Sequence, residues 1–124
     1  MLIEHLNIPN DLWVDIYQTG SSVICNPPVL DTDEDYVIYT NKESQLRKWL
    51  LANGVTQSCE DKEEYDLESE AMDCYRKDNI NLIVVYNKTT HSKWVVATKL
   101  ARKLNLLKKE QRITLFKYIL YGEI

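Results

Sequence analysis

The sequence contains few of the residues that cross-link or interrupt a small protein: three cysteines, three glycines and three prolines among 124 residues. Cys25, Cys59 and Cys74 are widely spaced and odd in number, and the chain has two histidines, His5 and His91. This spacing matches neither a disulfide framework nor a zinc site. We therefore expect three reduced thiols, mostly buried, in a cytoplasmic protein.

Long apolar runs are missing as well. No segment is apolar over the length that a membrane-spanning helix needs, and residues 1–6 lack the basic start and apolar stretch of a secretory signal. With 44 % hydrophobic and 27 % charged residues, the composition is typical of a globular protein. We expect one domain, residues 1–124, that buries a single core without disulfides or metals and has no membrane partner.

The net charge of −4 combines two segments of opposite sign. Residues 93–117 carry a net charge of +7, whereas residues 1–92 carry −10. Basic helices in the first segment would face the phosphates of a nucleotide or nucleic acid, or would simply present solvated faces. Double-stranded DNA is an improbable partner, because the chain is acidic overall and lacks a stripe of alternating aromatic and basic residues.

Hydrophobic alternation predicts five strands, and the last of them is apolar enough to lie in the centre of a sheet. An acidic segment, 60–70, separates the third from the fourth and carries seven acids and one lysine. We expect it to be a solvated connection or, alternatively, a negatively charged partner-binding tip. The expected strands are 12–17 with an end at Thr19-Gly20, 36–39, 55–59, 71–76 and 80–86.

Helical periodicity and end signals predict the remaining elements. Thr40 and Glu43 have the spacing of a capping box, in which each side chain bonds the backbone N–H of the other. The order of strands and helices indicates an α+β fold, a mixed β-sheet with helices packed on one side. The expected helical segments are a single turn at 21–25 and helices at 40–53, 92–104 and 108–121.

One motif points to chemistry. A strand ends at Gly20-Ser21, and after residues 22–32 the segment Asp33-Glu34-Asp35 opens the next strand. Backbone N–H groups of a glycine turn can reach phosphate oxygens, and carboxylates hold Mg²⁺ between a protein and a triphosphate. Because Asp33 and Asp35 are two residues apart in a strand, they point to the same face and can share a metal ion.

This pattern resembles the signature of the nucleotidyltransferase superfamily, in particular its small, often phage-encoded members. The resemblance covers most of the chain and implies a minimal nucleotidyltransferase-like domain with Mg²⁺ or Mn²⁺ at Asp33 and Asp35. It also implies a cytoplasmic location, in the host if a phage encodes the protein. The matching segments are Gly20-Ser21, Cys25-Asn26-Pro27-Pro28-Val29, Asp31-Thr32-Asp33-Glu34-Asp35-Tyr36, Asn81-Leu82-Ile83-Val84 and the closing residues from Ala97 to Gly122.

The chain departs from the superfamily pattern at one position. Active members carry a third carboxylate between two apolar residues of a later strand, and here Asn81 stands between Ile80 and Leu82. Asparagine can coordinate through its carbonyl oxygen but cannot act as a general base. Transfer would then need another base, Asp73 or Asp78, neither of which has the expected strand position.

The resemblance leaves two functions open. The first is transfer of a nucleoside monophosphate from a nucleoside triphosphate to a hydroxyl of a protein, an RNA or a small molecule. Gly20 and Ser21 would hold phosphates, Asp33 and Asp35 the metal, and Asn81 the acceptor, while Lys99 or Arg102 would steady the triphosphate. The second is a catalytically degenerate scaffold that binds or inhibits a host protein.

Overall fold

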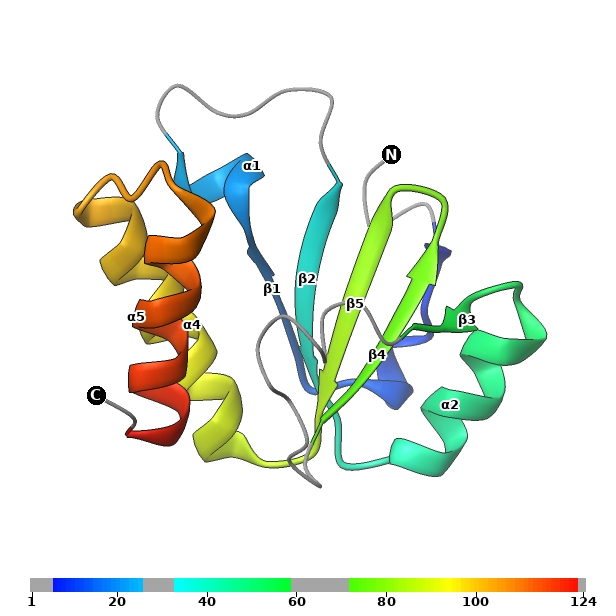
Figure 1. Ribbon diagram of the computed structural model, residues 1–124. Helices are drawn as coiled ribbons and strands as arrows, with labels where there is room; N and C mark the ends of the chain where they lie inside the picture. Colours follow the sequence, from blue (N-terminus) through cyan, green and yellow to red (C-terminus); the bar gives the residue numbers. More distant parts are fainter. Residues whose placement is uncertain (1–5, 26–32, 59–71, 123–124) are drawn as a thin grey trace.

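The computed structural model describes residues 6–25, 33–58 and 72–122. Within these ranges the chain forms a five-stranded mixed sheet with helices packed against it (Figure 1). This confirms the predicted α+β class. The elements, in chain order, are η2 (Asn10–Leu12), β1 (Asp15–Thr19), α1 (Ser21–Ile24), β2 (Glu34–Tyr39), α2 (Glu43–Ala52), β3 (Thr56–Gln57), β4 (Met72–Lys77), β5 (Ile80–Val85), α4 (Lys88–Lys103) and α5 (Lys109–Tyr121).

The sheet has the order β1-β2-β5-β4-β3, so β5 is central as predicted. β5 runs parallel to β2, whereas β1 is antiparallel to β2 and β4 is antiparallel to β5. All six residues of β5 are buried, because helices or loops cover both of its faces. β1 and β3 lie at the two edges.

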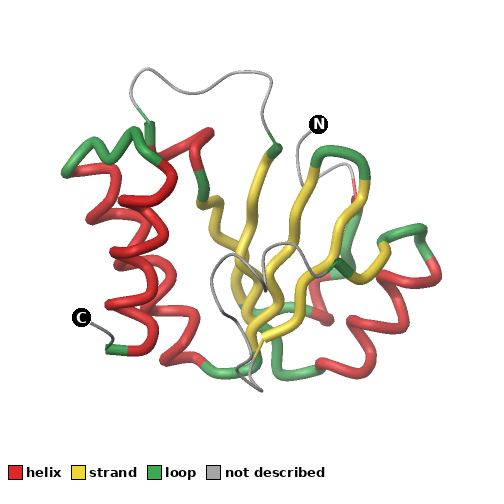
Figure 2. The backbone as a smooth tube through the Cα atoms, viewed as in Figure 1, coloured by secondary structure: helices red, strands yellow, loops and turns green. Residues whose placement is uncertain are grey.

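One face of the sheet is covered by α1, α4 and α5, which form a single layer (Figures 1 and 2). The rings of Trp94 on α4 and Phe116 on α5 lie 5.1 Å apart and pack over Val37 and Ile83 of the sheet. A buried hydrogen bond of 2.7 Å between the hydroxyls of Thr19 and Thr98 joins the end of β1 to α4. The end of β1 is therefore tied to the helix layer.

The opposite face is covered by α2, so the helices are not all packed on one side as expected. Leu46 and Leu50 of α2 pack on Ile38, Leu82 and their neighbours in the sheet. The physical reason is strand alternation: β2 and β5 are apolar on both faces, and each face must be buried. Figure 1 shows α2 and the helix pair α4–α5 on opposite sides of the sheet.

Two helix starts differ from the prediction. The capping box is wrong: α2 begins at Glu43, and the Thr40 hydroxyl instead donates to the Leu12 carbonyl at 2.7 Å and accepts from the Lys42 N–H at 3.0 Å. α4 begins at Lys88 rather than residue 92. Its start is fixed by Asn87, whose side-chain oxygen accepts from the N–H groups of the next turn.

Arg112, one of the basic residues of the segment 93–117, is a structural residue. It is buried, and its guanidinium donates to the carbonyl oxygens of Leu106 and Leu107 at 3.0 and 2.8 Å. The same nitrogen lies 3.4 Å from the Cys25 sulfur, so it also ties the connection between α4 and α5 to α1. No helix in the described ranges has both the length and the apolarity to span a membrane.

The placement of α2 predicts unequal costs for two adjacent substitutions. Leu50 is fully buried against the sheet, whereas Leu51 is 48 % exposed. Leu50→Ala should lower the free energy of unfolding by about 2–5 kcal/mol, because it leaves a cavity. Leu51→Ala should change it by less than about 0.5 kcal/mol in urea denaturation. Equal costs would contradict the position of α2.

Candidate functional site

The predicted acidic residues converge at one end of the sheet. Strand register places Thr19 beside Asp35, and Asp35 beside Asn81. Asp33 directly precedes β2, so Asp33 and Asp35 lie on the same side, as the sequence predicts. We call Asp33, Asp35, Asn81 and Arg76 the acidic cluster. It lies on the sheet face that α1, α4 and α5 cover, at the edge where β1 ends and β2 and β5 begin.

Gly20 is required by the close approach of Asp35. Its φ of +84° belongs to the left-handed region, and a Cβ added there would lie 2.1 Å from an oxygen of the Asp35 carboxylate. Any side chain at position 20 would therefore collide with that carboxylate. The glycine–serine turn and the second aspartate of the motif are thus in direct contact across β1 and β2.

The centre of the cluster is occupied by Arg76, from the end of β4. Its guanidinium donates to both oxygens of Asp33, at 3.0 and 3.1 Å, and to the side-chain oxygen of Asn81 at 3.0 Å. Its Nε–H donates to the Asp78 carbonyl at 3.1 Å. A bidentate pair of this kind is stronger than an ordinary surface ion pair, because its two hydrogen bonds are parallel and charge-assisted.

Asn81 completes the hydrogen-bond network. Its side-chain nitrogen donates to Asp35 at 2.9 Å, while its oxygen accepts from Arg76. Asn81 is buried, and Arg76 and Asp33 are partly exposed. The amide therefore orients Asp35 and Arg76 relative to each other, and it uses its oxygen on the arginine instead of offering it to an acceptor substrate.

This arrangement does not fit a bound divalent cation. N–H donors point at both Asp33 oxygens and at one Asp35 oxygen, where a metal ion would need free lone pairs. The described ranges also contain no group of three or more His, Cys, Asp or Glu side chains placed to hold a metal ion. One guanidinium thus stands where the sequence motif predicts Mg²⁺.

Neither of the two alternative bases takes the strand position expected of a third carboxylate. Asp73 lies on the opposite face of the sheet from Cys74 and Arg76, and it accepts a hydrogen bond from the Tyr86 hydroxyl. Burial, followed by this hydrogen bond, raises the pKa of Tyr86 well above its usual value of 10. Asp78 lies in the β4–β5 turn with a positive φ of 52°. Its backbone carbonyl, which bonds Arg76, contributes no base.

The predicted phosphate-binding residues Ser21, Lys99 and Arg102 are not among the residues that the hydrogen bonds of the acidic cluster join. Ser21 begins α1, a helix of four residues, so the helix dipole contributes little to holding an anion. Lys99 and Arg102 are exposed on α4. Neither of these two side chains forms a hydrogen bond or ion pair within the part of the chain that the structure describes. Their roles in nucleotide binding stay predictions.

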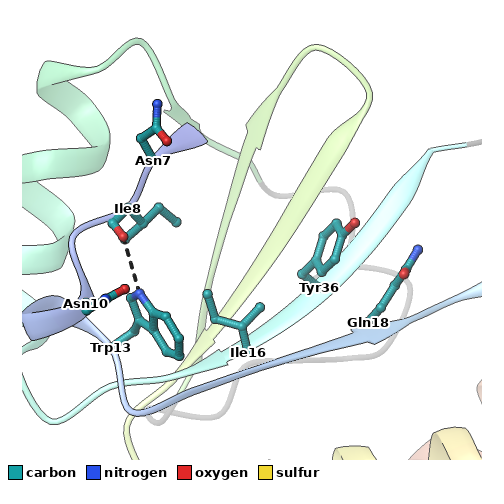
Figure 3. Close-up of a pocket in the computed structure, with 7 residues that line it drawn as sticks. All are labelled: Asn7, Ile8, Asn10, Trp13, Ile16, Gln18 and Tyr36. Carbon is teal, nitrogen blue, oxygen red and sulfur yellow. Dashed lines mark hydrogen bonds between the residues drawn. The ribbon is translucent and has the colours of Figure 1, made fainter. Parts of the chain in front are cut away.

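A separate pocket of about 460 Å³ opens on the α2 side of the sheet. Gln18 and Tyr36 line it, and each is one residue from a member of the Thr19–Asp35 pair, so strand alternation turns them to the opposite face. The residues that line the pocket are all uncharged, and Figure 3 shows them around one hollow: Asn7, Ile8, Asn10, Trp13, Ile16, Gln18 and Tyr36. This pocket suits an uncharged group and lies apart from the acidic cluster.

Sequence reasoning missed Arg76, although a signal for it exists. The residues Asp78-Asn79 lie between two strands and have the composition of a two-residue hairpin turn. That turn pairs Lys77 with Ile80 and therefore Arg76 with Asn81, as the structure has it.

We compared the chain with known proteins. No protein-family model, curated protein or solved structure matches it.

Gly20→Ala should destabilise the protein more than Gly122→Ala. Gly122, with φ 69° and ψ 18°, is in the αL region, which costs a residue with a Cβ about 1–2 kcal/mol, and nothing lies within 4 Å of a Cβ there. Gly20, with φ 84° and ψ −177°, is in a region nearly confined to glycine, which costs about 1–3 kcal/mol. At Gly20 the Asp35 carboxylate must also move away, which we expect to add about 1–3 kcal/mol through its lost hydrogen bonds. Urea denaturation of both variants measures the difference. Similar costs would mean that the contact with Asp35 is easily relieved.

The bond between Tyr86 and Asp73 predicts a dependence on alkaline pH. The pKa of Tyr86 is higher in the folded protein than in the unfolded chain, so its contribution to stability is complete below pH 10 and is lost as the pH rises further. The free energy of unfolding should fall less steeply in Tyr86→Phe than in the wild type above about pH 10. Because a single proton is involved, the difference in slope stays below about 1.4 kcal/mol per pH unit. Parallel curves would contradict the shift.

Proposed function

We propose that this protein is a nucleotidyltransferase-like domain that acts by binding a partner protein and does not transfer a nucleotide. The observation that carries this proposal is the position of Arg76, which bonds both Asp33 oxygens and the Asn81 side chain. A guanidinium at the centre of the acidic cluster provides one of the two positive charges that a divalent metal ion would bring.

Four positions of the motif support a relationship to the nucleotidyltransferase scaffold. Gly20, Asp33, Asp35 and Asn81 are up to 61 positions apart in the sequence, yet hydrogen bonds and strand register bring them to one end of the sheet. The contact between Gly20 and Asp35 gives a physical reason for their pairing in the motif. This convergence favours common ancestry of the site over an acidic loop that merely solvates the start of a strand.

The chemistry of Arg76 favours binding over transfer. A metal ion neutralises a triphosphate, lowers the pKa of the attacking hydroxyl and orients the leaving group. A guanidinium remains protonated, donates hydrogen bonds and has no lone pair to accept a proton. Arg76 also uses its donors on Asp33, Asn81 and Asp78, so the protein itself already satisfies most of its binding capacity.

The same reasoning indicates the kind of partner. A domain of this size that lacks transfer chemistry acts through its surface. If it is an accessory protein of phage type, its partner is a host protein that it binds or inhibits. Metal-dependent transfer from a nucleoside triphosphate to a protein or RNA hydroxyl is the competing hypothesis. It requires Arg76 to leave Asp33 when metal and nucleotide arrive.

A labelling experiment separates the two hypotheses. Wild-type protein and the Asp33→Asn/Asp35→Asn variant are incubated with α-labelled nucleoside triphosphates, Mg²⁺ or Mn²⁺, and cell lysate. We expect the same background label with both proteins, because Arg76 holds the cluster without a metal. Label that appears on a protein or RNA with the wild type alone would overturn the proposal and establish a transferase.

Removal of Arg76 should create a metal site. In Arg76→Gln, both Asp33 oxygens lose their donors, so Mn²⁺ can bridge Asp33 and Asp35. We expect Mn²⁺ at 100 times its dissociation constant to stabilise this variant by about 2.7 kcal/mol and to leave the wild type unchanged in thermal unfolding. Arg76→Gln/Asp33→Asn/Asp35→Asn is the matched control and should not respond. Equal responses of wild type and Arg76→Gln would show that the arginine does not exclude metal.

A further inference from the structure

The exposed apolar side chains of this protein are concentrated at α4 and α5. In the described ranges, seven large apolar residues are exposed, and five of them belong to these two helices or their connection. The five are Val96, Leu100, Leu104, Leu107 and Tyr118, with exposed fractions of 37–56 %. Single exposed apolar residues are ordinary, but a group on one pair of helices indicates an interaction surface.

Three of the five residues follow one line along α4 to its C-terminal end. Val96, Leu100 and Leu104 are spaced by four residues, whereas Leu107 lies beyond Asn105, whose positive φ of 52° turns the chain away from the helical path. Residues at this spacing lie above one another on a helix surface. Two exposed lysines, Lys99 and Lys103, lie on the same side of the helix. We call the three apolar residues and these two lysines the α4 outer stripe: Val96, Lys99, Leu100, Lys103 and Leu104.

The core does not require this stripe. α4 already buries a different side, on which Trp94, Ala97 and Ala101 pack against the sheet and α5. Val96 and Leu100 each precede one of the buried alanines by one residue, which places them about 100° away around the helix. The stripe is therefore a second apolar side, left open by the fold as described.

Lysines accompany the apolar residues on this side. Lys99 and Lys103 lie within the stripe, three residues after Val96 and Leu100, and both are exposed. The whole segment 93–117 carries a net charge of +7. Exposed leucines between lysines complement a surface that carries both apolar and acidic side chains.

We propose that the α4 outer stripe binds an amphipathic acidic helix of the partner protein. This inference rests on the proposed function and names the chemistry of the partner. Leucines of such a helix would pack on Val96, Leu100 and Leu104, while its glutamates and aspartates would pair with Lys99 and Lys103. The apolar contacts supply affinity, and the charges select an acidic over a basic helix.

The test uses a designed peptide of about 20 residues, long enough to form a helix in water, with leucines along one side and glutamates beside them. A second peptide carries glutamine in place of every glutamate. Binding is measured by fluorescence anisotropy of labelled peptide and mapped by amide chemical shifts of the full chain. We expect the acidic peptide to bind, with shift changes confined to α4 and α5, and binding to weaken as salt increases.

Three variants resolve the roles of the side chains. Leu100→Gln/Leu104→Gln should weaken binding of the acidic peptide by about tenfold or more, because it removes the apolar contact. Lys99→Gln/Lys103→Gln should remove the preference for the acidic peptide over its glutamine counterpart. Leu51→Gln, an equally exposed substitution on α2, is the control and should leave binding unchanged. All of these positions are exposed, so the fold is preserved, which circular dichroism checks.

Three outcomes would overturn the inference. The wild type fails to bind the acidic peptide, or the leucine variant binds as tightly as the wild type. The third is self-association in light scattering that Leu100→Gln/Leu104→Gln abolishes, which would assign the stripe to a second copy of this chain. None of these outcomes bears on nucleotide transfer, so failure here is distinguishable from failure of the proposed function, which the labelling experiment decides.

Discussion

The contact on which the acidic cluster depends is the bidentate pair between Arg76 and Asp33, with Asn81 held against both Arg76 and Asp35. It joins the end of β4 to the start of β2 across the central strand. Asp33 and Asp35 are like charges at one end of the sheet, and the guanidinium of Arg76 offsets part of their repulsion. The β4–β5 turn contacts this cluster through the bond from Arg76 to the Asp78 carbonyl, and the end of β1 contacts it through the close approach of Gly20 to Asp35.

The sheet itself imposes the second constraint. Because β2 and β5 are apolar on both faces, the chain has to supply two covering layers. α2 with residues 6–13 provides one, and α1, α4 and α5 provide the other. Strand alternation then separates the chemistry: the acidic cluster lies on the α4 side, whereas the uncharged pocket and the Tyr86–Asp73 pair lie on the α2 side.

The two functional features differ in kind. The cluster is internally satisfied, since its acids, amide and guanidinium bond one another. The α4 outer stripe has apolar and basic groups exposed in excess of what the fold needs. A protein that acts through binding would show this division, with an internally hydrogen-bonded acidic cluster and an open helix surface. This is why we place the activity of the chain on α4 rather than at the acidic motif.

Local patterns were sufficient to predict the α+β class, the central position of β5, the single turn after Ser21 and the shared face of Asp33 and Asp35. These features depend on periodicity and on residues next to one another.

The start of α2 was not predictable in the same way, because the Thr40 hydroxyl donates to the Leu12 carbonyl instead of capping the helix. Nor was the second covering layer, which depends on how both faces of the strands are buried. Arg76 lies 43 residues from Asp33, and hairpin register together with sheet order had to bring them together. The sequence thus determined which acids could share a site, and the tertiary structure decided that an arginine occupies it, because only strand pairing sets which distant charges meet.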